Sequence, residues 1–366
     1  TSVFTFRYGL TYSDYHRNPF TEFDLTTLGL PKNMKDTATN LVFPRWAPEG
    51  YQEFGTEGYW LMDRQEGVHH WSGSMAKVMG AHNIKVGGER RFNQLDYLQP
   101  GNPSGRFNFG RGVTCKDRFT CPGNEGNGLA AMLVGWATGS EFQIEPKAFS
   151  RSAYWGFYFQ DDWKLTRKLT VNLGLRYDFD VPRWETLDRY SYWDLNQQSS
   201  IKATGYDTRG VIKFVDKDRR SPFDSDRNNW QPRIGFAYAA NSKTSIRSGY
   251  GLFYTLSRAT VFGRPGTGFT INSPAIWTLD SNATLNARLS NPFPNGLLLP
   301  PGRAQGDNTL LGFNASTIVS SNNRNPEYHS WNLSIQRELA LQSVLELNYT
   351  GSRGTHLFMP ITTLSP

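Results

Sequence analysis

The sequence lacks any apolar run long enough to form a membrane-spanning helix. Such a helix needs about 18 or more consecutive apolar residues, and no run among the 366 residues approaches that length. The first residues, TSVFTFRYGL, also lack the layout of a secretory signal peptide. The chain runs straight into a strand-like pattern, so we expect it to be either processed or a piece of a longer protein.

The sequence has little of what a helical enzyme or a nucleic-acid-binding protein needs. Hydrophobic residues make up only 38% of the chain, which suits strands and loops better than helices around an aliphatic core. The formal net charge is +7, but Lys and Arg are scattered and form no basic run. We therefore expect no nucleic-acid partner. Mild positive charge would suit a protein surrounded by anionic lipid headgroups.

Catalytic and metal-binding motifs are also missing. The six His residues show no HExxH or comparable spacing, and the GTG at 266–268 is too short for a dinucleotide fingerprint. Asp161 and Asp162 are adjacent carboxylates, but neighbours on a strand point to opposite faces and cannot act on one substrate atom. We expect no enzymatic activity, no metal site and no cofactor.

Cysteine is scarce, with only Cys115 and Cys121, which lie close together in GVTCKDRFTCPGN. Their spacing fits no metal motif, and two thiols alone would make a poor zinc site. The ring between them is short enough to close cheaply, and Gly and Pro supply the bends. A local disulfide is expected, which implies an oxidising compartment.

Aromatic residues and a period-of-two alternation are abundant. Aromatics make up 14% of the chain. In WGFYFQDDWKLTRKLTVNLGLRYDF, residues 155–179, the apolar side chains fall on one face because successive side chains of a strand alternate. We expect Trp155, Trp163 and Tyr177 to lie toward lipid headgroups. The side chains expected to face lipid are Phe157, Phe159, Leu173, Leu175 and Tyr177.

The strand candidates form pairs joined by short turns, and long segments separate the pairs. A strand at 4–12 is followed by the pairs 70–79 with 84–91, 155–163 with 169–179, 231–238 with 244–256, and 328–339 with 344–351. The segments between are rich in Asn, Gly, Pro and Ser and are expected to be irregular: 13–68, 92–153, 180–230 and 257–327. Within the second, residues 126–139 have the spacing of a short helix.

This asymmetry of turns and loops decides the fold class. Strands of about ten residues, with tight turns on one side and long loops on the other, are typical of bacterial outer-membrane barrels. We predict an all-β fold, a transmembrane antiparallel β-barrel with long extracellular loops.

The opposite face of the strands carries polar side chains that would line the lumen of such a barrel. They either contact a plug or a passing ligand, or pair with one another to solvate the wall, and the sequence leaves both open. The ten candidates are Arg7, Lys85, Glu89, Arg176, Asp178, Arg233, Arg247, Gln336, Glu346 and Asn348.

Several of these segments resemble the barrel of TonB-dependent receptors of the Oar-like kind. The resemblance covers most of the chain in consistent order and rests on YWGFYFQDDWKLTRKLTVNLGLRYDF (154–179), NNWQPRIGFAYAANSKTSIRSGYGLFY (228–254), NPEYHSWNLSIQREL (325–339) and LELNYTGSRGTHL (345–357), with weaker matches at MGAHNIKVGGERR (79–91) and GNGLAAMLVG (126–135). It implies the bacterial outer membrane, a plug domain inside the barrel, uptake driven by the inner-membrane TonB system, and ligand capture by outer loops.

The strand count indicates a portion of a large barrel. We count roughly nine strands, whereas single-chain bacterial barrels use even numbers and plugged transporters about 22. No plug-like segment or TonB box is recognisable, so residues 1–366 are expected to be a barrel segment whose plug and remaining strands come from elsewhere. A passive porin, a surface adhesin and a secreted β-rich enzyme remain as alternatives. The ligand could be a siderophore, an oligosaccharide or a peptide.

Overall fold

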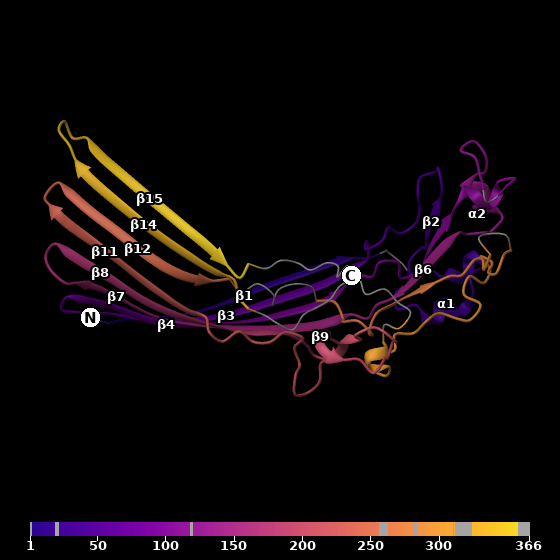
Figure 1. Ribbon diagram of the computed structural model, residues 1–366, viewed down its shortest axis with the longest axis horizontal. Helices are drawn as coiled ribbons and strands as arrows, with labels where there is room; N and C mark the ends of the chain where they lie inside the picture. The colour runs from indigo at the N-terminus through magenta and orange to yellow at the C-terminus, as the bar shows by residue number, and fades with distance from the viewer. Residues whose placement is uncertain are drawn as a thin grey trace.

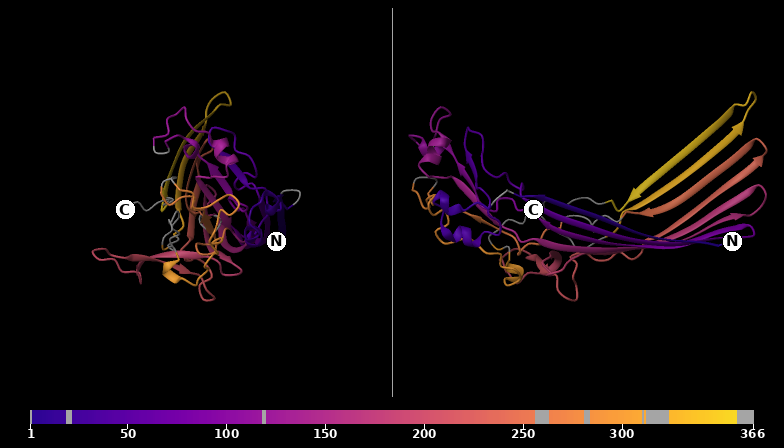
Figure 2. Two further views of the ribbon diagram at one scale, coloured as in Figure 1. Left: turned by 90° about the vertical axis from the view of Figure 1, so that its right-hand side faces the viewer. Right: turned by 180° about the vertical axis from the view of Figure 1, so that it is seen from behind.

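The main body of the protein is a wall of nine antiparallel strands. The computed structural model describes residues 2–18, 22–117, 120–255, 263–280, 284–309, 311 and 324–357. In the wall each strand pairs with the next wall strand along the chain, in the order β1-β3-β4-β7-β8-β11-β12-β14-β15 (Figure 1). The wall is curved and twisted, and β1 and β15 form its two edges among the described residues (Figures 1 and 2). The predicted all-β class is confirmed.

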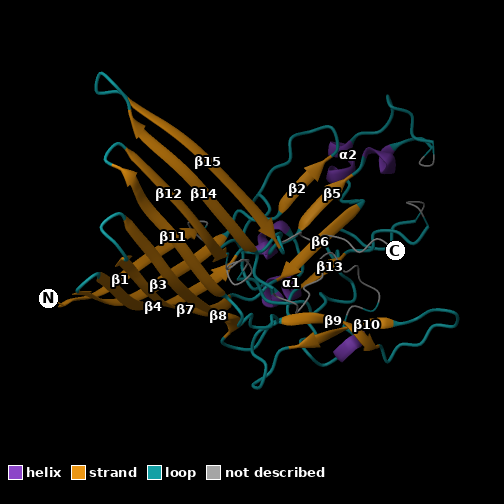
Figure 3. Cartoon of the chain, turned by 60° about the vertical axis from the view of Figure 1, so that its left-hand side comes forward, coloured by secondary structure: helices purple, strands orange, loops and turns teal. Residues whose placement is uncertain are grey.

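The nine strands agree in number and order with the sequence prediction. Their bounds are β1 Ser2–Arg17, β3 Met62–Met79, β4 His82–Leu98, β7 Ala148–Lys164, β8 Leu169–Glu185, β11 Trp230–Asn241, β12 Thr244–Tyr254, β14 Glu327–Glu338 and β15 Val344–Thr355. All four predicted hairpins form, and their short turns lie together at one end of the wall (Figure 3). The predicted strand end at Leu256 lies outside the described residues.

The turn between β3 and β4 consists of only two residues, Gly80 and Ala81. Gly80 has a φ of 58°, which glycine adopts without steric cost. A two-residue loop of this kind fixes the register of the hairpin, so Met79 lies opposite His82 and the pairing continues from there to Leu98.

The strands in the first half of the chain are longer than the predicted ten residues. β3 has 18 residues, and β4, β7 and β8 each have 17. Segments such as 92–98 and 180–185, which were predicted to be loop, therefore continue the ladder. Their alternation is lost because polar pairs replace the apolar side chains, for example Arg151 with Asp96 at 2.7 Å.

The long connections at the other end of the wall were expected to be irregular, and this was wrong for all four, because each contains strands among its described residues. Parts of 22–61, 99–147 and 263–309 fold together into what we call the loop unit (Figure 2). Its sheet has the order β13-β6-β5-β2, with β2 parallel to β5. The strand bounds are β2 Arg45–Pro48, β5 Arg106–Phe109, β6 Gly139–Ile144 and β13 Ile271–Pro274.

The loop unit has its own hydrophobic core. Phe107, Phe109 and Phe142 are fully buried, and Trp46 stacks on both Phe107 and Phe109 with ring centroids 5.1 and 5.8 Å apart. Burial of several aromatic rings is enough to give a small sheet a stable centre. The helices at its periphery are η1 Leu25–Leu28, α1 Lys32–Thr37, η2 Arg111–Thr114 and α2 Gly128–Leu133.

The short helix predicted within 126–139 forms as α2 and is shorter than the pattern suggested. Asn127 caps it, because its side-chain oxygen accepts a hydrogen bond from the backbone N–H of Ala130 at 3.0 Å. No helix among the described residues has the length and apolar character that a membrane crossing would require. Near α2, Cys115 and Cys121 are joined in a disulfide with their Cα atoms 5.6 Å apart.

The third long connection forms a separate hairpin beside the loop unit. Its strands are β9 Ser191–Gln198 and β10 Arg209–Phe214, and η3 Gly306–Asn308 packs near them (Figure 3). Asp307 fixes this contact by accepting hydrogen bonds from the backbone N–H and the hydroxyl of Ser200, both at 2.8 Å.

A buried carboxyl lies where the loop unit joins the wall. Glu145 follows β6, is only 2% exposed, and has its Oε1 atom 3.6 Å from Nε of Arg264. Arg264 in turn donates to the backbone oxygen of Gln99, and its guanidinium lies 5.0 Å from the ring of Tyr59. Burial raises the pKa of Glu145 to about 7, although the charge of Arg264 acts in the opposite direction.

We expect this junction to loosen as the pH rises. The carboxyl titrates near 4.5 when exposed and near 7 when buried, so its stabilising contribution is complete below pH 4.5 and is lost as the pH rises through about 7. The total change is about 3 kcal/mol for a shift of this size. After correction for the intrinsic effect of pH, hydrogen exchange of the amides in 139–147 should therefore be faster at pH 8 than at pH 5.

The matched variant is Glu145→Gln, which keeps the shape of the side chain and removes the titration. Its exchange, corrected for the intrinsic effect of pH, should be the same at both pH values. A wild-type protein with no excess opening at pH 8 would contradict the assignment.

Candidate functional site

The strand register sorts the side chains of the wall onto two faces. One, which we call the polar face, carries all ten polar candidates: Arg7, Lys85, Glu89, Arg176, Asp178, Arg233, Arg247, Gln336, Glu346 and Asn348. The other, the apolar face, carries Phe157, Phe159, Leu173, Leu175 and Tyr177. Phe157 and Leu175 remain 51% and 43% exposed, so this face presents rings and aliphatic groups that need an apolar environment.

A network of charged groups occupies the middle of the polar face. Arg176 bridges two carboxylates, with its Nη2 atom 2.6 Å from Oε1 of Glu89 and its Nε atom 2.8 Å from Oδ1 of Asp178. The hydroxyl of Tyr154 donates to the same Oδ1 atom at 2.8 Å. Strands β4, β7 and β8 are thereby connected through one guanidinium, whose planar fork suits two carboxylates at once.

Two further side chains extend the network to both sides. His70 on β3 has its Nε2 atom 2.9 Å from Oε2 of Glu89. Gln231 on β11 donates to Oδ2 of Asp178 and is 3% exposed. The network therefore crosses five adjacent strands, and its central carboxylate, Asp178, is only 6% exposed.

Glycines allow these large side chains to lie flat along the wall. A Cβ atom added at Gly156 would lie 2.5 Å from Nη2 of Arg176 and 2.6 Å from the hydroxyl of Tyr154. One added at Gly87 would lie 2.7 Å from the hydroxyl of Tyr158. Any other residue at these positions would push the polar side chains outward, so glycine keeps the face smooth and the network fixed.

The wall is hollowed beside the network, across β7, β8, β11, β12 and β14. The hollow has a volume of about 540 Å³, and its polar lining includes Gln160, Asn172, Arg233, Ser330 and Asn332. Arg233 lies over the ring of Phe253 at 4.8 Å, and no carboxylate among the described residues forms an ion pair with it. Amide, hydroxyl and guanidinium groups could bind a polar surface packed against this face.

The polar candidates thus separate into a central group and an outer group, which the sequence did not distinguish. Lys85, Glu89, Arg176, Asp178 and Arg233 lie in or beside the network and the hollow. Arg7 and Arg247 are exposed, and so are Gln336, Glu346 and Asn348 toward the other edge. Three residues of the network, His70, Tyr154 and Gln231, were not predicted as site residues, although the alternation of their strands places them on the polar face.

The adjacent carboxylates Asp161 and Asp162 lie on opposite faces, as the alternation predicted. Oδ2 of Asp161 is 2.7 Å from Nδ1 of His82 on the apolar face. Oδ1 of Asp162 accepts from Asn172 at 2.6 Å on the polar face. No cluster of three or more metal-ligating side chains occurs within the described part of the chain.

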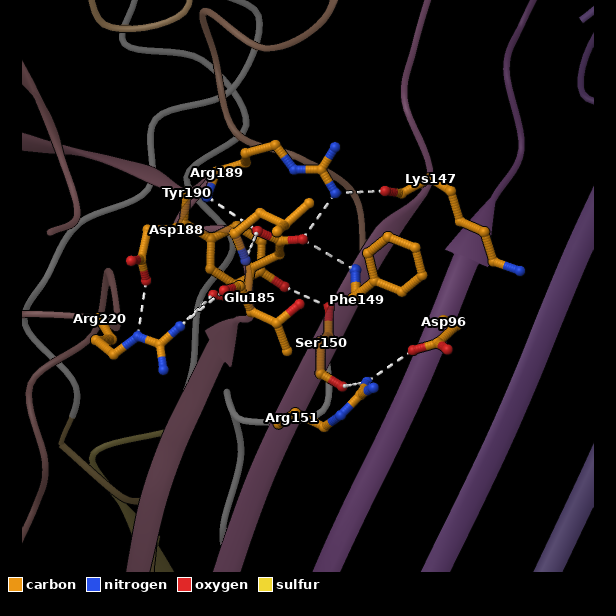
Figure 4. Close-up of polar contacts among 12 residues, drawn as sticks. Asp96, Lys147, Phe149, Ser150, Arg151, Glu185, Asp188, Arg189, Tyr190 and Arg220 are labelled. Carbon is orange, nitrogen blue, oxygen red and sulfur yellow. Dashed lines mark hydrogen bonds and ion pairs between the residues drawn. The ribbon is translucent and has the colours of Figure 1, made fainter. Parts of the chain in front are cut away.

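A second polar cluster fixes the ends of β7 and β8 near the long connections (Figure 4). Glu185 is fully buried and accepts hydrogen bonds from the backbone N–H groups of Phe149 and Arg189, at 3.1 and 3.0 Å. Its ion pair with the Arg189 guanidinium measures 2.8 Å. Ser150 and Tyr190 share a hydrogen bond of 2.6 Å next to it. The hydrogen bonds and the ion pair of this cluster join β7 and β8 to residues 189 and 190, so the cluster anchors the third long connection to the wall.

Comparison with known protein families decides the class. Residues 1–363 match the model of the outer membrane beta barrel domain. The chain belongs to this family. It is a β-barrel chain of the bacterial outer membrane, with the short turns at one end of its wall and long extracellular loops at the other. In such barrels the apolar face is the one that meets lipid.

The chain is also similar to three solved structures, at low identity. These are the closed form of the ferric-catecholate import receptor Fiu from Escherichia coli K12 (9% identity, TM-score 0.35, 83% of this chain and 32% of that chain), its open form (10%, 0.28, 83% and 38%) and the toluene transporter TodX from Pseudomonas putida (11%, 0.26, 96% and 63%). The chain therefore spans about a third of the length of Fiu and less than two thirds of TodX. No curated protein matches it.

Proposed function

We propose that the chain is part of a TonB-dependent receptor of the Oar-like kind, which takes up a ligand across the outer membrane with energy from the inner-membrane TonB system. The resemblance of 154–179 and 228–254 to such receptors supports this proposal. We propose no catalytic role for the chain.

The observation that carries the proposal is the fixed network on the polar face. A water-filled pore needs only hydrated, mobile charges on its wall. Here Arg176, Glu89 and Asp178 are tied to one another and lie flat over Gly156. A smooth, pre-organised polar surface is what a folded plug domain requires in order to pack against the wall, because little side-chain entropy is then lost on docking.

The edges of the wall and the loop unit indicate two further kinds of partner, namely additional barrel strands and the ligand. Lipid does not tolerate unpaired backbone groups, so we propose that further strands pair with β1 and β15. The loop unit, with its own core, would present the ligand-capturing surface outside the membrane. The ligand class remains open among siderophores, oligosaccharides and peptides.

The proposal can be tested on the protein encoded by the full reading frame, reconstituted in planar bilayers and in vesicles. It should conduct few ions, and it should bind the purified periplasmic domain of TonB. Steady, ungated conductance without TonB binding would identify a passive porin instead. Low conductance without TonB binding would favour a surface adhesin built on the same wall.

A further inference from the structure

Trp and His side chains form two bands on the apolar face, and Phe157 and Phe159 lie between the bands along β7. Near the short turns, Trp163 stacks on His82 with ring centroids 5.2 Å apart. Further along the same two strands, Arg90 lies opposite Trp71 on one side and Trp155 on the other. From residue 82 to residue 90, a rise of about 3.3 Å per residue at a tilt of about 40° gives about 20 Å along the membrane normal. The second band therefore lies near the outer boundary of an apolar zone about 25 Å tall.

Arg90 is held between two indole rings in this second band. Its guanidinium carbon lies 5.5 Å from the ring centroid of Trp71 and 4.8 Å from that of Trp155. Tyr8 packs against Trp71 at 5.5 Å and forms a hydrogen bond of 2.9 Å with His69. The rings immobilise the guanidinium while leaving the residue exposed.

No carboxylate in the described ranges forms an ion pair with Arg90. Two other cations farther along these strands are paired, since Arg151 lies 2.7 Å from Asp96 and Lys147 lies 2.8 Å from Asp63. An unpaired charge at the edge of hydrocarbon is costly unless an anion or water accompanies it. On a face that meets lipid, the nearest anions are lipid headgroups.

We propose that Arg90, held between Trp71 and Trp155, binds the phosphate of an anionic lipid in the outer leaflet. A guanidinium presents parallel N–H groups that match two phosphate oxygens, and its fixed orientation reduces the entropy lost on binding. The flanking rings would pack against the lipid next to the phosphate. This site does not depend on the proposed uptake function, because any barrel with this wall would present it.

The test compares a phosphorylated lipid with the same lipid lacking phosphate. The full-length protein in neutral detergent is titrated with lipid A carrying two phosphates and with dephosphorylated lipid A, and bound lipid is counted by native mass spectrometry. We expect the wild type to prefer the phosphorylated form. Arg90→Gln should reduce that preference about tenfold, which corresponds to about 1.4 kcal/mol. Arg90→Lys should retain part of it, because Lys keeps the charge and loses the fork.

The matched control is Arg91→Gln, the neighbouring residue on the polar face, where the guanidinium lies 4.6 Å from the ring of Tyr154. It should leave the lipid preference unchanged. Folding of every variant is checked by its heat-dependent mobility in gel electrophoresis. If Arg90→Gln does not fold, the partial loss of preference expected for Arg90→Lys is measured instead. Equal binding of the two lipids by the wild type, or an equal loss in Arg91→Gln, would overturn the site. Competition by millimolar inorganic phosphate as strong as that by the lipid would assign the site to free phosphate instead.

Discussion

Leu173→Arg is expected to make folding into lipid less favourable by about 2–4 kcal/mol more than Asn172→Arg. Leu173 lies on the apolar face of β8, opposite Ile234 of β11, and a charge near the bilayer midplane on a lipid-facing site costs this much in outer-membrane barrels. Asn172 lies on the polar face, where its amide donates to Asp162. An Arg at that position could hydrate or pair with the same carboxylate.

Urea-dependent refolding into phospholipid vesicles measures this difference for the full-length protein. Phe179→Arg is the graded control, because residue 179 is on the same face but closer to the headgroups, where the cost falls to about 0–1 kcal/mol. Equal tolerance of Arg at 172 and 173 would show that the apolar face does not meet hydrocarbon.

Arg176→Met is expected to destabilise the wall by about 3 kcal/mol. It leaves Glu89 and Asp178 on the polar face without their shared cation, and removing one partner of a buried ion pair costs about 3–5 kcal/mol. We expect the low end of that range because the side chains of Arg176 and Glu89 remain 20% and 19% exposed. Arg176→Lys should restore only part of the loss, since an ammonium cannot bridge both carboxylates in the same geometry.

The control for this second prediction is Arg247→Met on the same face of β12. Arg247 is exposed, and no ion pair to it occurs among the described residues. Its replacement should change stability by less than about 0.5 kcal/mol. If Arg176→Met and Arg247→Met had equal effects in the same refolding assay, the network would not contribute to the stability of the wall.

The strand pairs and their faces could be predicted because the signal for them is local. Within 169–179 each residue differs in polarity from its neighbour, and lipid on one side enforces that pattern over the whole membrane span. The extensions of β3, β4, β7 and β8 could not be predicted in this way. In 92–98 the outward residues include Gln94 and Asp96, since no lipid constrains them there.

The loop unit was missed for a different reason. Its core brings Trp46 against Phe107 and Phe109, which lie about sixty residues further along the chain. The parallel pairing of β2 with β5 also joins distant segments, and four-residue strands are too short to show a period. Composition rich in Gly, Pro and Asn is typical of irregular loops, and the aromatic residues among them were the only sign of a core.

Three members of the polar network were predicted, but His70, Tyr154, Gln231 and the connections between the members were not. Alternation placed Glu89, Arg176 and Asp178 on one face, together with seven other residues. Their contacts depend on the register of β4 with β7 and of β7 with β8, which brings Gly156 between Glu89 and Asp178. Register between strands is set by turns and packing, which a single sequence does not specify in detail.

The assignment of lipid to one face of the wall and a polar lumen to the other is tested most directly by a spin-label scan of residues 170–177. Single Cys substitutions in the full-length protein are labelled with a nitroxide, and the disulfide between Cys115 and Cys121 leaves no free thiol in the described residues. Collision rates are measured with oxygen, which concentrates in lipid, and with a water-soluble nickel chelate. Oxygen access should be highest at 171, 173, 175 and 177 and lowest at 170, 172, 174 and 176. Equal nickel access on both faces, or a period other than two, would contradict a lipid-facing wall.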